Sequence, residues 1–184
     1  MSTIKTNAIQ TTAGKPILNS TGSILQVAQT ILNTNFSTTS QSYTDVTGLS
    51  VTITPSSTSS KILILAYLTA TNTGQNGSFM IVTRNGSTMS GSLSTAGALN
   101  TTTGAVQSSF GFINQSGTTY TVVPMQLHYL DSPASTSAQT YQVRTRTGSA
   151  NSVLVNHQGS NSNSNNNPDF GNYVSSITAI EVSA

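Results

Sequence analysis

The side chains of this sequence that could act as bases near neutral pH are its two histidines, His128 and His157. Nucleophilic catalysis by serine needs such a base, with an orienting group, beside the hydroxyl. Serine is abundant, but the Gly-x-Ser-x-Gly elbow of many serine hydrolases does not occur in the sequence. His128 lies within the apolar stretch Met125–Leu130, which favours a packed or interface histidine over a catalytic one. We therefore expect no serine hydrolase.

Acid–base chemistry on a sugar would need two carboxylates at a fixed separation across the scissile bond. The four carboxylates are scattered along the chain, at Asp45, Asp131, Asp169 and Glu181. Asp131 precedes Ser-Pro and is expected to open a turn, whereas Glu181 is expected at a solvated edge of the last strand. We expect no catalytic residue, no bound metal and no cofactor.

The composition excludes several classes of partner. Charged residues make up 5% of the sequence and the net charge is +2. Nucleic-acid binding needs clustered Lys and Arg, but only Arg144 and Arg146 stand close together. The longest apolar run, Ile62–Leu68, is far shorter than the roughly 20 residues of a membrane helix. With no cysteine, disulfides are excluded as well. We expect no nucleic-acid partner and no membrane insertion.

Alternation of apolar and polar residues indicates strands. In the clearest case, Tyr141 and Val143 fall on one face while Arg144 and Arg146 fall on the other. The run Ile62–Leu68 is apolar on both faces, which is typical of a central strand buried between two sheets or between a sheet and a subunit interface. Both readings stay open from the sequence.

The turns between these strands define the fold class. Asn85-Gly86 suits the positive backbone angles of a tight hairpin, and the Gly- and Thr-rich stretch 87–104 is expected to form a long loop. About nine short strands without an amphipathic helix predict an all-β fold, an antiparallel β-sandwich of jelly-roll type. We expect this domain to span residues 24–184, after an extended arm at residues 1–23.

Residues 1–18 and a series of later segments resemble parts of known virion proteins; the later segments are Phe36–Ser40, Tyr43–Leu49, Ile53–Leu63, Leu130–Pro133 and Ile177–Val182. In this order they resemble fibre and particle proteins of tailed bacteriophages that infect marine and freshwater bacteria, cyanobacteria among them. The resemblance implies a homotrimeric jelly roll similar to tumour-necrosis-factor-like domains, joined to the particle by its N-terminal arm. Its place, as a tail fibre or a capsid (head) decoration protein, stays open.

The arm is one of two candidate functional segments. Its sparse apolar residues and one proline could let it add an extended segment to a partner's sheet edge; they are Ile4, Ile9, Pro16, Ile17 and Leu18. A frayed terminus is the alternative. The resemblance favours attachment to other virion proteins.

The second candidate is the polar segment that follows the strand Val153–Val155. Its amides can bond to sugar hydroxyls and its aromatic rings can stack on a sugar, so it could contact a receptor; the candidates are Asn156, His157, Asn163, Asn166, Phe170 and Tyr173. Three copies around an axis would strengthen a weak contact to a cell-surface glycan. A plain solvated loop is the alternative, and threefold symmetry could also gather three copies of His157 around a metal.

These expectations combine into a non-enzymatic structural protein, made in the host cytoplasm and displayed on the virion surface. Its partners are itself, other virion proteins and, for host attachment, a cell-surface glycan. A receptor-binding adhesin is the first alternative, and a polysaccharide depolymerase is the second.

Overall fold

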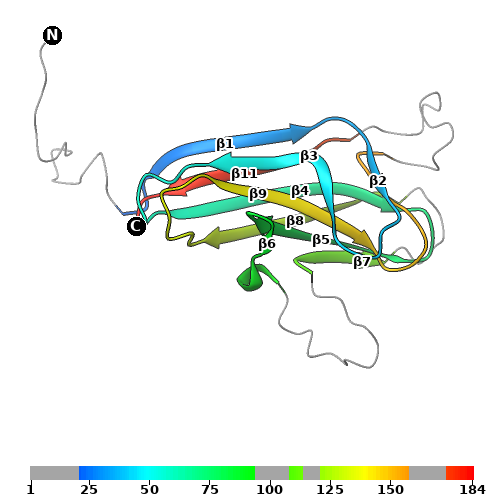
Figure 1. The fold of residues 1–184 in the computed structure, drawn as a ribbon. Helices are drawn as coiled ribbons and strands as arrows, with labels where there is room; N and C mark the ends of the chain where they lie inside the picture. Colours follow the sequence, from blue (N-terminus) through cyan, green and yellow to red (C-terminus); the bar gives the residue numbers. More distant parts are fainter. Residues whose placement is uncertain (1–20, 94–107, 114–120, 158–172) are drawn as a thin grey trace, which may run out of the picture.

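The computed structural model describes residues 21–93, 108–113, 121–157 and 173–184 (Figure 1). The regular structure in these ranges consists of β-strands and one 3-10 turn, η1 (Ser90–Ser92). The strands form two antiparallel sheets packed face to face, so the predicted all-β sandwich is confirmed. Across the described ranges, no helix is long and apolar enough to cross a membrane.

The first sheet, called sheet I here, has β4 (Lys61–Asn72) at its centre. All neighbouring strands in it are antiparallel. Along one edge of β4 runs β8 (Val123–Asp131); along the other edge lie β11 (Ser175–Val182) and, further along, β10 (Val153–Val155). The outermost strands are β1 (Ile24–Leu32), which pairs with β11, and β2 (Phe36–Thr38), which pairs with β10. The central position predicted for Ile62–Leu68 is confirmed, because β4 is paired along both edges.

The second sheet, sheet II, covers the inner face of sheet I (Figure 1). Its strands, in spatial order, are β3 (Thr44–Ile53), β9 (Gln139–Thr147) and β5 (Gly77–Arg84). Along the far edge of β5, β7 (Phe110–Ile113) pairs with its first half and β6 (Ser87–Thr88) with its last two residues.

The pairing of early strands with late strands gives the jelly-roll order. The pairs are nested in the sequence: β5 with β7, β4 with β8, β3 with β9, and β1 with β11. Successive pairs alternate between sheet II and sheet I. A long antiparallel hairpin rolled up in this way produces the two Greek keys of a jelly roll.

The core lies between the two sheets and follows the alternation read from the sequence. Ile62, Ile64 and Leu68 of β4 are fully buried, and they share one apolar cluster with Tyr141 and Val143 of β9. Side chains at alternate positions of a strand point to opposite faces, so this burial leaves the intervening residues on the outer faces.

The hairpin predicted at Asn85-Gly86 is present. Both residues have positive φ angles, 49° and 79°, and Arg84 pairs with Ser87 across the two-residue turn. The long loop predicted to start at Ser87 is wrong for its first residues, because Ser87–Thr88 form the short strand β6 and Ser90–Ser92 form η1. Residues 94–104 of that stretch lie outside the described residues.

The expectation that Glu181 lies at a solvated edge is wrong. The residue is fully buried, and its strand β11 is flanked by β1 and β4. Its carboxylate accepts hydrogen bonds from the Ser56 backbone N–H at 2.7 Å, from Ser56 Oγ at 2.6 Å and from the side chain of Gln26. Burial alone raises the pKa of a carboxyl, but these hydrogen bonds lower the pKa of Glu181 to about 2.

Candidate functional site

The structure describes three of the residues predicted to contact a partner, namely Asn156, His157 and Tyr173. The other predicted contact residues lie outside the described residues: Ile4, Ile9, Pro16, Ile17 and Leu18 of the arm, and Asn163, Asn166 and Phe170 of the polar segment. Their roles stay predictions.

Asn156 is placed in the interior rather than on the surface. Its side-chain amide donates to the backbone oxygens of Leu32, at 2.8 Å, and Thr34, at 3.1 Å, while its Oδ1 accepts from Ser175 Oγ at 2.6 Å. The residue is fully buried and has a φ of 59°, a left-handed conformation that asparagine tolerates better than most residues. Its side chain therefore ties the chain around β10 to the end of β1.

His157 and Tyr173 flank the segment 158–172. His157 is half-buried and lines a hollow of about 180 Å³ whose other lining residues are Asn35, Phe36, Ser37 and Leu154. The backbone N–H of Tyr173 donates to the backbone oxygen of Asn156 at 3.2 Å. No group of three or more potential metal ligands among His, Cys, Asp and Glu gathers in the part of the chain that the structure describes.

A second hollow, of about 320 Å³, lies between the sheets along the side where β8 borders sheet I and β5–β6 border sheet II. We call it the polar hollow. It is lined by Arg84, Asn85, Ser87, Thr88, Met89, Gly91, Tyr129 and Asp131. These residues come from segments far apart in the sequence, and the jelly-roll order brings them together.

Strand register explains why charged groups face into this side of the sandwich. Asp131 on β8 is the partner of the buried Ile62, so its side chain points between the sheets. Arg84, the last residue of β5, is the partner of the buried Tyr141 and points to the same interior. Both strands end at this point, which lets a carboxylate and a guanidinium enter the sandwich without breaking the core.

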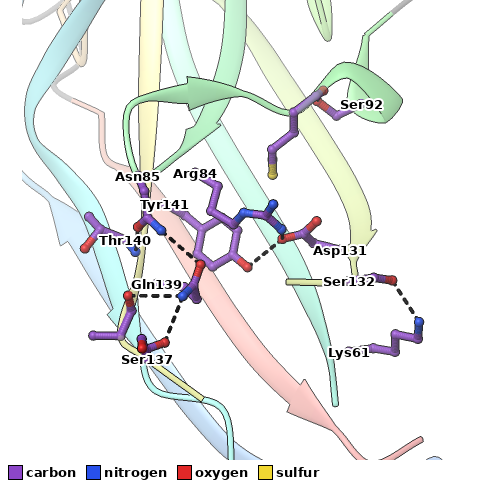
Figure 2. A network of polar contacts seen from close by, with 12 residues as sticks. Lys61, Arg84, Asn85, Ser92, Asp131, Ser132, Ser137, Gln139, Thr140 and Tyr141 are labelled. Carbon is purple, nitrogen blue, oxygen red and sulfur yellow. Dashed lines mark hydrogen bonds and ion pairs between the residues drawn. The ribbon is translucent and has the colours of Figure 1, made fainter. Parts of the chain in front are cut away.

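The Asp131 carboxylate binds both neighbours through one oxygen (Figure 2). Its Oδ2 accepts from Arg84 Nη1 at 2.7 Å and from the Tyr141 hydroxyl at 2.8 Å. Burial raises the pKa of Tyr141, and its bond to Asp131 raises it further, so the phenol keeps the proton that it donates. For Arg84, burial lowers the pKa, but the contact with Asp131 outweighs it and the net pKa is raised.

The same network leaves polar atoms directed at the hollow. Within the described residues, Asp131 Oδ1 and the Nε and Nη2 groups of Arg84 make no hydrogen bond. Asp131 is 6% exposed, but its Oδ1 is not one of the fully buried side-chain atoms that lack a hydrogen-bond partner, so water or a ligand in the hollow can reach it. The hollow thus offers one acceptor and a fork of donors side by side.

Asn85 holds the rim of the hollow in place. Its Nδ2 donates to Gln139 Oε1 at 3.0 Å, and its Oδ1 accepts from the Thr140 backbone N–H at 2.9 Å (Figure 2). A third bond runs from the Asn85 N–H to the Thr140 oxygen at 2.8 Å. The β5–β6 turn is therefore fixed to the start of β9.

The outer face of sheet I is a different kind of candidate, a surface for association. Val27, Ile180, Leu63 and Leu130 are register partners across β1, β11, β4 and β8, so one continuous apolar row crosses the four strands. Val27 is 59% exposed and Leu130 is 52% exposed. In a chain with few hydrophobic residues, a continuous row of exposed apolar side chains indicates a surface that packs against another protein subunit.

The outer face of sheet II has the opposite character. Arg144 forms an ion pair with Asp45 at 2.7 Å, and the Arg146 guanidinium lies 6.0 Å from the ring centre of Tyr43 and 5.9 Å from that of Phe79. Burial raises the pKa of Tyr43 to about 12, although the charge of Arg146 lowers it somewhat. Charge is thus kept on one outer face of the sandwich and is nearly absent from the other.

Sequence reasoning did not find the polar hollow. The sequence predicts a turn opener at Asp131 and indicates no role for Arg84 beside the Asn-Gly turn. A usable signal existed, because the sequence has only ten charged residues and two of them stand where strands end. Nothing in the spacing of residues 84, 131 and 141 predicts that they meet.

In comparisons with known proteins, no family model and no curated sequence matches this chain.

Proposed function

We propose that this chain is a non-enzymatic structural protein of the virion surface of a tailed phage. It assembles as a homotrimer and is anchored to the particle, as a fibre or decoration component, by its N-terminal arm. The phage assignment and the count of three rest on the sequence resemblance. The observation that carries the proposal is the apolar row on the outer face of sheet I, which supports self-association.

The energetics of this face favour a partner. Complete burial of a Val, Leu or Ile side chain is worth about 1.5–3 kcal/mol. Ile24, Val27, Ile31 and Leu130 are each between 52% and 65% exposed. Covering these four half-exposed side chains would therefore contribute roughly 3–6 kcal/mol per subunit. With three subunits, this contribution is large enough to offset much of the entropy lost on association.

The positions of the chain ends support an anchored, outward-pointing domain. Gly22 N–H donates to the Ser183 oxygen at 2.8 Å, so the arm enters beside the end of β11, where Val182 pairs with Lys61 at the start of β4. Val155, just before the polar segment, pairs with Ala70 near the other end of β4. The described residues that follow the arm and those that precede the predicted receptor segment thus lie at opposite ends of β4.

The described carboxylates support a structural role. Glu181 is enclosed by Ser56 and Gln26, Asp131 is bound by Arg84 and Tyr141, and Asp45 is paired with Arg144. Each one holds strands or turns together. They are not arranged as two facing carboxylates across an open cleft, the arrangement that glycoside hydrolysis needs.

Two charge insertions test the association face. Leu130→Lys places a cation in the apolar row, and Ile113→Lys is the matched control, because Ile113 is 63% exposed on β7 of the other sheet. Sedimentation velocity should show dissociation of the assembly for Leu130→Lys and an unchanged assembly for Ile113→Lys. An intact assembly in Leu130→Lys would contradict the proposed face.

Particle attachment is tested separately. Removing residues 1–20 should abolish incorporation into virions while the purified protein still assembles. Normal incorporation of the shortened chain would contradict the anchoring role of the arm.

A further inference from the structure

We propose that the polar hollow is a binding site for a neutral saccharide, held through two adjacent hydroxyls. The proposal does not depend on the virion role or on the association face. It also differs in place from the predicted receptor segment, since Asp131 lies near the start of β4, at the end of the sandwich where the arm enters. The volume, about 320 Å³, lies at the small end of the range of roughly 300–1,000 Å³ typical of small-molecule sites.

The unpaired atoms of the hollow match a diol. Asp131 Oδ1 is an acceptor, and Arg84 Nε and Nη2 are donors beside it. A hydroxyl both donates and accepts hydrogen bonds, so one hydroxyl of a vicinal pair can donate to the carboxylate while the next accepts from the guanidinium. Hydrogen bonds to charged groups are stronger than those between neutral groups, which favours these two contacts as the anchor.

The balance of charge favours a neutral ligand over an anion. Arg84 and Asp131 carry opposite charges at 2.7 Å, and the other lining residues are uncharged. An anion would gain the guanidinium but meet the carboxylate at the same short distance. A sugar hydroxyl suffers no such repulsion, because it can satisfy both groups.

The site is ordered before a ligand arrives. The buried Tyr141 hydroxyl fixes the Asp131 carboxylate, Asp131 fixes Arg84, and Asn85 fixes the turn at the rim. Ordering of side chains on binding is a main cost of association, so a site that is already ordered retains more of its contact energy.

The remaining lining gives the ligand's C–H groups somewhere to pack. Tyr129 and Met89 contribute apolar surface beside the polar pair, while Ser87 and Thr88 add hydroxyls at the mouth. A Cβ at position 91 would collide with the Tyr129 hydroxyl, so Gly91 permits η1 to close against this ring. The lining is nevertheless mainly polar, which suits a ligand rich in hydroxyls better than an apolar one.

Ser87→Phe tests the proposal without touching the buried network. Ser87 is exposed and is the register partner of Arg84, so a phenyl ring there points to the same side and fills the mouth of the hollow. Thr58→Phe, at an exposed position of the β3–β4 turn, is the matched control for adding an aromatic ring to the surface. Circular dichroism shows whether both variants keep the wild-type β signal.

The probes are the methyl glycosides of glucose, galactose, mannose and N-acetylglucosamine, with inorganic phosphate as the anionic probe, each titrated into full-length protein and followed by NMR. We expect saturable binding of at least one glycoside, unchanged in Thr58→Phe but weakened about tenfold or more by Ser87→Phe, because the phenyl ring occupies the space that the sugar needs to reach Arg84 and Asp131. Failure of every glycoside to bind overturns the proposal. So does equal binding in wild type and Ser87→Phe, equal loss in both variants, or a response to phosphate alone.

Discussion

Replacing Glu181 by glutamine should lower the free energy of unfolding substantially at neutral pH. The carboxylate is fully buried and accepts two hydrogen bonds from Ser56 and one from Gln26. Glutamine keeps the size of the side chain but replaces one accepting oxygen with an NH₂ donor. That donor would meet a backbone N–H, a hydroxyl or another amide, so one of the three bonds is lost and a buried donor is left without an acceptor.

The magnitude and the pH range follow from the pKa of Glu181. Its value is lowered from the ordinary 4.5 to about 2, a difference that corresponds to about 3 kcal/mol. Because the pKa in the folded protein is below that in the unfolded chain, this stabilisation is present above pH 4.5 and is lost as the pH falls toward 2. The variant should therefore be less stable than wild type by up to about 3 kcal/mol at pH 7, with the difference shrinking steadily below pH 4.5.

Urea unfolding followed by tyrosine fluorescence, at equal protein concentration and at several pH values between 2 and 7, measures this difference. Asp45→Asn is the control, because it removes a surface ion pair whose Asp45 side chain is 63% exposed and should cost less than about 1 kcal/mol. A Glu181→Gln effect as small as that of the control, or one that does not change with pH, would refute the reasoning.

Three further predictions concern other polar groups. Asn156→Gly keeps the positive φ but removes three side-chain hydrogen bonds, so it should destabilise the fold by about 2–4 kcal/mol in urea unfolding; an effect below about 1 kcal/mol would contradict a structural role. Asp131→Ala leaves the partly exposed Arg84 and the buried Tyr141 hydroxyl without their shared acceptor and should cost about 1–3 kcal/mol in urea unfolding, whereas simultaneous replacement of Asp131 by Ala and Arg84 by Met should cost less than the single change. The pKa of Tyr43 is about 12 in the folded protein and 10 ordinarily, so its contribution to stability is present below pH 10 and lost as the pH rises toward 12. Tyr43→Phe should therefore lose less unfolding free energy than wild type between these pH values, and an equal loss in both proteins would contradict this.

Much of the fold could be predicted because local chemistry and global packing agree in sheet II. In β9 the apolar side chains occupy alternate positions, and both Tyr141 and Val143 are buried as that alternation predicts. The Asn85-Gly86 turn is likewise specified by residues that accept positive φ angles. In such segments the sequence pattern and the structure carry the same information.

The error at Glu181 has a physical cause in sheet I. Ile177, Ala179 and Glu181 occupy alternate positions of β11 and face the core. The residues between and after them, among them Ile180 and Val182, face outward and are also apolar. When both faces of a strand are apolar, alternation cannot tell which side is the core. The apolar residues on the outer face of β11 therefore explain the wrong prediction for Glu181, and they also make the outer face of sheet I suited to association.

The candidate site could not be predicted for a different reason. The polar hollow depends on contacts between Arg84 and Asp131, 47 residues apart, and on the placement of β8 beside β4. Such contacts arise from strand order, and a single sequence specifies strand order only weakly. The arm and the polar segment could be noticed from composition, but their roles depend on partners that composition does not name.

The most direct measurement is the mass of the full-length protein in solution by light scattering. Assembly of a homotrimer through the apolar face of sheet I predicts three times the mass of one chain across a wide range of concentration. A stable monomer at all concentrations would contradict that assembly, and a stable dimer would contradict its threefold symmetry.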